Sequence, residues 1–131
     1  MIKRMCAVLC AVSLILCMSV STAFADNRAN SAFSSTEVIF TSSMFAEFSA
    51  LTTKSYPKIT VSVTLQRKEG SSWVNERALP APTFAASNTT TWGTSKSYSS
   101  YGTVGETYRL KAVFNAEGVT ATAYSVSHVK R

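Results

Sequence analysis

Apolar and polar side chains alternate with a period of two along much of the chain after residue 35. The alternation is clearest in KITVSVTLQRK, where the apolar positions are Ile59, Val61, Val63 and Leu65. The positions between them carry hydroxyl or amide groups. Because successive side chains of a β-strand point to opposite faces of its sheet, this pattern predicts a strand with one buried and one solvated face.

Other segments show the same pattern. In MFAEFSAL the positions expected to face the core are Met44, Ala46, Phe48 and Ala50. The positions expected to face outward are Phe45, Glu47, Ser49 and Leu51. In WGTSKSYS one face is expected to carry Trp92, Thr94, Lys96 and Tyr98. These segments predict further two-faced strands, as a sandwich of two sheets requires.

The stretch GTVGETYRLKAVFN joins a glycine-containing turn to an alternating strand. Tyr108, Leu110, Ala112 and Phe114 are expected to line its core face. A tyrosine near the start of such a strand is typical of the tyrosine corner, in which the ring packs inside and the hydroxyl bonds to backbone a few residues upstream. We therefore expect a structural role for Tyr108.

Two segments are less regular. Residues 78–91 contain two prolines and no clean period, so they predict a long connection, with Phe84 tucked back onto the domain. In VTATAYSVSHV the apolar set changes face between Ala123 and Tyr124, which predicts a β-bulge there.

About seven short strands separated by turn residues are expected in total. Of the 106 residues from Asp26 onwards, 32 are Ser or Thr. The apolar residues form no long stripe with the 3.6-residue period of a helix. The sequence thus predicts an all-β fold: a single immunoglobulin-like antiparallel β-sandwich over residues 36–131, preceded by a loose N-terminus at 26–35.

The first 25 residues have the pattern of a cleaved signal peptide. Lys3 and Arg4 precede an apolar run from Met5 to Met18, and Ala23-Phe24-Ala25 supplies a cleavage site. The apolar run is shorter than the roughly 20 residues of a membrane span. We expect export, to the extracellular space or the cell surface, with membrane contact only through the signal peptide. The three cysteines, Cys6, Cys10 and Cys17, all precede the cleavage site.

Charge narrows the range of partners. Loss of Lys3 and Arg4 lowers the basic count from 13 to 11 against 7 acidic residues, so the net charge falls from +6 to +4. The basic residues are scattered, without the clustered stripe of a nucleic-acid-binding protein, so no nucleic acid is expected. The expected partners are a cell-wall polymer or another envelope protein.

No catalytic, cofactor-binding or metal site is expected. The chain after residue 25 has no cysteine and one histidine, His128, near its end. Ser55 and Lys58 match Ser-x-x-Lys, but Pro57 prevents the helix on which that motif depends. The carboxylates are dispersed, and no cluster has the spacing of metal ligands.

Aromatic residues supply the one candidate ligand site. Trp73, Trp92, Tyr98 and Tyr101, with Tyr124 as a further ring, could form an exposed platform on which a sugar stacks. In the alternative interpretation, Trp73 braces its hairpin against a neighbouring strand and Trp92 fills the core.

The segments KITVSVTLQRKEGSSWV and GETYRLKAVFNAEG resemble fibronectin type III-like domains. More specifically, they are similar to small secreted immunoglobulin-like β-sandwich proteins of Gram-positive bacteria, a family without an assigned function. The likeness covers most of residues 36–128, with a longer proline-containing stretch at 79–87. It implies a fold and a location outside the membrane, and no chemistry.

The sequence therefore favours a secreted, non-enzymatic binding or structural protein of the cell envelope. Two alternatives remain open: a carbohydrate- or cell-wall-binding module, and a secreted antibacterial peptide-like protein. The carbohydrate- or cell-wall-binding module requires Trp73 and Trp92 to be exposed and coplanar.

Overall fold

The structure, a computed structural model, describes residues 30–131 as eight β-strands. The expected signal peptide at 1–25 lies outside the described residues. The strands are β1 (Phe33–Phe40), β2 (Phe45–Tyr56), β3 (Thr60–Glu69), β4 (Ser72–Leu79), β5 (Thr89–Ser97), β6 (Thr107–Ala116), β7 (Val119–Tyr124) and β8 (His128–Val129).

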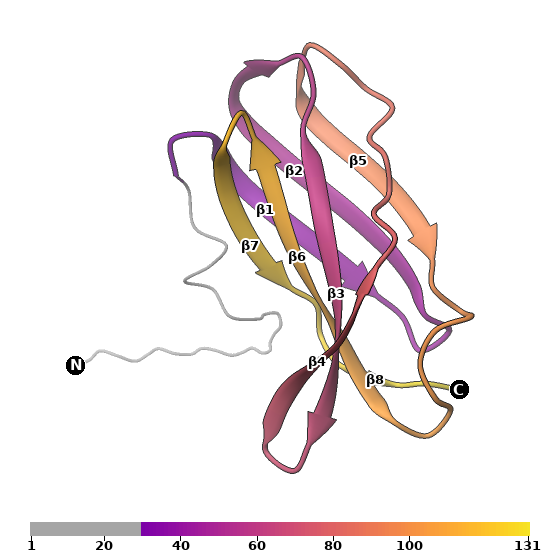
Figure 1. The fold of residues 1–131 in the computed structure, drawn as a ribbon. Coiled ribbons are helices and arrows are strands. Elements are labelled where there is room, and N and C mark those ends of the chain that lie inside the picture. Colours follow the sequence, from indigo (N-terminus) through magenta and orange to yellow (C-terminus); the bar gives the residue numbers. More distant parts are fainter. Residues whose placement is uncertain (1–29) are drawn as a thin grey trace, which may run out of the picture.

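The strands form two antiparallel sheets that face each other (Figure 1). The smaller sheet has the order β1-β2-β5. The larger has the order β4-β3-β6-β7, with the two-residue β8 also paired to β6. This arrangement confirms the predicted all-β sandwich and adds one short strand to the seven expected.

The core lies between the sheets and is built by the alternation seen in the sequence. In β2 and β3 the inward positions are those predicted, and the outward positions of β2 are exposed. The largest fully buried side chains are Trp92, Tyr98, Tyr108, Phe33, Phe40, Phe48 and Phe114. No described residue is a cysteine, so within this part of the chain the sandwich is held by packing and hydrogen bonds.

The ordered domain begins earlier than predicted. Phe33 opens β1, is buried, and packs edge-on against Phe114 at a ring-centroid distance of 6.1 Å. The Asn30 carboxamide oxygen accepts hydrogen bonds from the backbone N–H groups of Ala32 and Phe33, at 2.8 and 2.7 Å. Over residues 30–35 the expectation of a loose segment was therefore wrong, because the Asn30 side chain fixes this turn and the apolar pair Ala32 and Phe33 enters the core.

The predicted bulge between Ala123 and Tyr124 is also corrected. β7 keeps a regular register with β6 through Tyr124, and the irregularity lies just beyond, where β8 pairs His128 with Tyr108. Between these pairings Ser125 turns inward. Its hydroxyl oxygen accepts the Leu110 N–H at 2.8 Å, so a side chain replaces a missing backbone acceptor.

The connection from β4 to β5 carries the chain from the larger to the smaller sheet. Its irregular part spans residues 80–88. Phe84 is buried and packs edge-on against Trp92 at 6.0 Å, which confirms the expectation for this residue. The Thr94 hydroxyl donates to the Thr83 carbonyl at 2.8 Å, which fastens the loop to β5.

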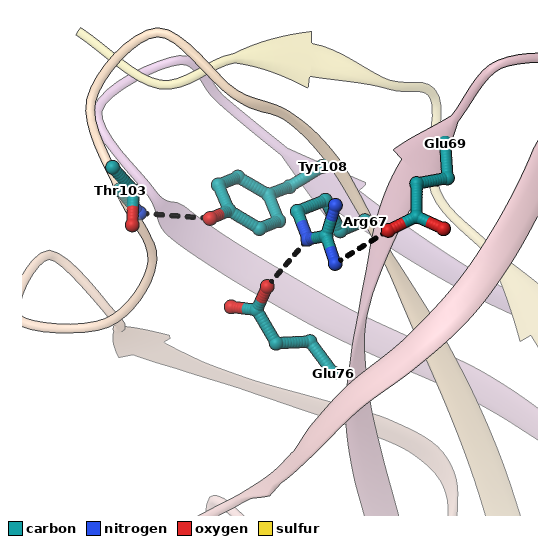
Figure 2. A network of polar contacts seen from close by, with 5 residues as sticks. All are labelled: Arg67, Glu69, Glu76, Thr103 and Tyr108. Carbon is teal, nitrogen blue, oxygen red and sulfur yellow. Dashed lines mark hydrogen bonds and ion pairs between the residues drawn. The ribbon is translucent and has the colours of Figure 1, made fainter.

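Tyr108 has the geometry expected of the tyrosine corner (Figure 2). Its ring is fully buried, and its hydroxyl oxygen accepts the Thr103 N–H at 2.8 Å. Gly102 makes this approach possible: its φ is +80°, and a Cβ there would lie 2.9 Å from a Tyr108 ring carbon. Gly105, in the same loop, has a φ of +96° but open space around it.

We expect Gly102→Ala to lower the free energy of unfolding by about 2–4 kcal/mol, since it adds a clash with a buried ring to the cost of a positive φ. Gly105→Ala, which meets only the backbone cost of about 1–2 kcal/mol, is the matched control. Urea denaturation measures both. Equal losses in the two variants would show that Gly102 is not constrained by Tyr108.

Two threonines that face the core differ in their hydrogen bonding. The buried Thr36 hydroxyl has no hydrogen-bond partner within the described part of the chain. The Thr52 hydroxyl accepts the Trp92 indole N–H at 3.2 Å and donates to the Lys54 carbonyl at 2.8 Å.

We therefore expect opposite effects from the same substitution. Thr36→Val should raise the free energy of unfolding by about 1 kcal/mol, because it removes an unpaired buried hydroxyl. Thr52→Val should lower it by about 1–3 kcal/mol, because the indole N–H loses its acceptor. Urea denaturation measures both variants. A lower free energy of unfolding in both would contradict the unpaired state of the Thr36 hydroxyl.

Candidate functional site

Two of the four expected platform residues belong to the core. Trp92 is 1% exposed and Tyr98 is 0% exposed. Trp92 stands opposite Ala50, an inward position of β2, and the Tyr98 hydroxyl donates to the Pro80 carbonyl at 2.7 Å. The expectation of an exposed platform at these positions is therefore corrected, and a module that pairs Trp73 with Trp92 is excluded. The alternation placed Trp92 and Tyr98 correctly on one face, and that face is the buried one, as the alternative interpretation of Trp92 required.

The other two residues are separated in the structure. Tyr101, in the loop before β6, packs edge-on against Tyr98 at 6.1 Å, and the Arg77 guanidinium lies 4.9 Å from the centre of its ring. Trp73 stands opposite Lys68 in the β3–β4 pairing, on the outward side of the larger sheet. Of the four expected residues, it alone lies on the outer face of a sheet.

Arg109 of β6 joins Trp73 to a second ring on this outer face. Its guanidinium carbon lies 4.5 Å from the centre of the Trp73 ring and 4.4 Å from that of Tyr124. The two rings come from β4 and β7, which lie on opposite sides of β6 in the sheet order. Both distances are within the range of a cation–π interaction. The structure thus brings together three side chains that are far apart in sequence.

A chain of hydrogen bonds orients the arginine. Arg109 Nε donates to Gln66 Oε1 at 2.7 Å, and Gln66 Nε2 donates to Asn75 Oδ1 at 2.8 Å. Gln66 stands opposite both residues in the sheet and is only 7% exposed. Its amide is thus used on both sides, which fixes the direction of the guanidinium.

The outer side of this sheet is basic; we call it the basic face, defined by Lys68, Trp73, Arg109, Lys111 and Tyr124. Lys68 lies 5.8 Å from the Trp73 ring centre, and Lys111 stands opposite Tyr124. Partial burial lowers the pKa of Arg109 from its ordinary value, while the nearby Tyr124 acts in the opposite direction.

The carboxylates of the larger sheet are engaged elsewhere. Within β3, β4, β6 and β7 they are Glu69 and Glu76, and both form ion pairs with Arg67, at 3.0 and 2.8 Å. Arg67 stands opposite Tyr108, on the inward side of the sheet, as Figure 2 shows. The hydrogen bonds to Glu76 and then Glu69 raise the pKa of Arg67. The basic face therefore keeps its cations without neutralising carboxylates in its own strands.

The described residues were also compared with the requirements of a metal site and of a membrane-spanning helix. No group of three or more His, Cys, Asp or Glu side chains there is placed to hold a metal ion. His128 of β8 packs edge-on against Phe40 at 6.3 Å. Between residues 30 and 131, no helix is long and apolar enough to cross a membrane.

Neither protein-family models nor curated proteins match this chain.

Trp73 and Tyr124 could be named as candidate ligand residues from the sequence, whereas Arg109 and Gln66 could not. Arg109 lies between the predicted core positions Tyr108 and Leu110, so the alternation gives it an outward position, where it lies. Outward arginines are common, however, and this position alone does not indicate a site. The missing information was the pairing of β3 with both β4 and β6, which brings Gln66 between Asn75 and Arg109.

Tyr98 predicts a pH dependence of stability. Burial, with a smaller effect of Tyr101, raises the pKa of Tyr98 to about 12, whereas an unfolded tyrosine titrates near about 10. As the pH rises, Tyr98 therefore loses its proton in the unfolded state before it does so in the folded state, and this favours unfolding. The contribution of the neutral Tyr98 to the free energy of unfolding is complete below about pH 10 and is lost as the pH rises towards about 12.

We expect the stability difference between the wild type and Tyr98→Phe to be constant below about pH 10 and to shift in favour of the variant above it. Urea denaturation at a series of pH values measures this. The lost hydrogen bond to Pro80 adds only a constant offset. A difference that does not change with pH would contradict the raised pKa.

Proposed function

We propose that this chain is an exported, non-enzymatic protein that binds a polymer of the cell envelope through the basic face. The observation that carries the proposal is the placement of Trp73 and Tyr124 on either side of Arg109 at the outer surface of a sheet. Several neighbouring outward positions supply hydroxyl, amide and ammonium groups, among them Thr64, Asn75 and Lys111.

The chemistry of these side chains suits a sugar-containing polymer. An aromatic ring presents an apolar surface to the apolar face of a sugar, while neighbouring polar groups orient the sugar hydroxyls. Both rings are only partly buried, so each keeps surface for a ligand. Asn75 and Lys68, opposite Gln66 and Trp73, are placed to supply the polar contacts.

Two expectations from the sequence support an envelope location. Residues 1–25 have the pattern of a signal peptide, and the chain resembles small secreted β-sandwich proteins of Gram-positive bacteria. In this role, recognition rests on side chains held by the strands of the larger sheet themselves.

The test is co-sedimentation of the exported part of the chain, residues 26–131, with purified cell walls. We expect Trp73→Ala and Tyr124→Ala each to weaken binding by about tenfold, or about 1.4 kcal/mol, which is within the contribution of one buried aromatic ring. Phe45→Ala is the matched control, because Phe45 is a partly exposed ring on the outer side of the smaller sheet.

Absence of wall binding by the wild type would overturn the proposal. Loss of binding in Phe45→Ala, with binding intact in Trp73→Ala and Tyr124→Ala, would also overturn it by placing the site on the other sheet. Denaturation curves of each variant establish that the sandwich remains folded.

A further inference from the structure

Arg109 has more hydrogen-bonding capacity than the described part of the chain uses. A guanidinium carries five N–H donors, and in Arg109 the one on Nε is taken by Gln66. Within residues 30–131, neither terminal nitrogen of Arg109 has a hydrogen-bond partner or an ion pair. Four donors of a charged group are therefore free to face a ligand.

These donors are held in a defined orientation. Two aromatic rings contact the guanidinium, and the Gln66 amide fixes its Nε edge. Gln66 is in turn held by Asn75. A planar fork fixed in this way matches the paired oxygens of a carboxylate or a phosphate, and little side-chain entropy remains to be lost on binding.

The surrounding charges favour an anion as the ligand. Lys68 and Lys111 lie on the same face, and the carboxylates of these strands are paired with Arg67 on the other side of the sheet. An approaching anion thus meets three cations without a competing carboxylate from the same strands, which raises its local concentration.

We propose that Arg109 is the recognition site for an anionic group, a phosphodiester or a carboxylate, carried by the polymer that binds the basic face. This inference rests on the proposed function and narrows its ligand from envelope polymers in general to acidic ones. The rings hold the sugar or backbone portion, and the free edge of the guanidinium binds the acidic oxygens with two parallel hydrogen bonds.

The experiment measures the binding of residues 26–131 to three soluble probes: poly(glycerol phosphate), polygalacturonate and neutral dextran. We expect binding to one or both anionic probes, weakening as salt is raised, and at least tenfold weaker binding to dextran. The phosphate probe and the uronic-acid probe distinguish the two sources of the anionic group.

The decisive variants are Arg109→Gln and Arg109→Lys. We expect Arg109→Gln to weaken anion binding at least tenfold. Arg109→Lys keeps the charge but loses the planar fork, so it should also weaken anion binding. Arg77→Gln is the matched control: it removes the same charge and a similar cation–π contact, with Tyr101, at a position outside the basic face. It should bind within about twofold of the wild type.

Equal losses in Arg77→Gln and Arg109→Gln would overturn the inference, because they would show a response to net charge alone. Equal binding of dextran and the anionic probes would also overturn it. If walls still bind Arg109→Gln as they bind the wild type, while Trp73→Ala fails to bind, the anion site falls and the proposed function stands. If Arg109→Gln does not fold, Arg109→Lys carries the same test.

Discussion

The hydrogen bond between the Tyr108 hydroxyl and the Thr103 N–H fixes the start of β6, and the rest of the larger sheet depends on that register. Tyr108 points into the core, so Arg109, the next residue, must point outward. A slip of one residue would bury the arginine and expose the tyrosine. The tight packing of Gly102 against the Tyr108 ring opposes such a slip.

Under the proposed function, the same strand serves both stability and recognition. Its inward positions fill the space between the sheets, and its outward positions form the centre of the basic face. Because β6 lies inside the sheet, with β3 on one side and β7 on the other, groups from both neighbours converge on Arg109. The proposed site is built on a central strand, so its geometry does not depend on loops, and Arg109 is oriented by side chains of the sheet itself.

The fold was largely predictable because the long strands carry their own two-residue alternation, as in β2, β3 and β6. The candidate site was less so. Alternation shows which residues of a strand share a face, but it does not show which of the two faces is buried. For Trp92 this depends on the partner strand β2, where the opposite residue is the inward Ala50. Likewise, Trp73, Arg109 and Tyr124 meet only through the pairing of β4, β3, β6 and β7, which is non-local information. The early start of β1 depends on one local hydrogen-bonding residue, Asn30, in an otherwise polar segment.

The most direct measurement of the central claim is a nuclear magnetic resonance titration of isotopically labelled protein with soluble cell-wall fragments. The indole N–H of Trp73 and the Nε–H of Arg109 should shift with ligand concentration. The indole N–H of Trp92, bonded to Thr52 inside the core, should stay in place. Shifts confined to the outer side of the smaller sheet, around Phe45 and Leu51, with Trp73 unchanged, would contradict the account.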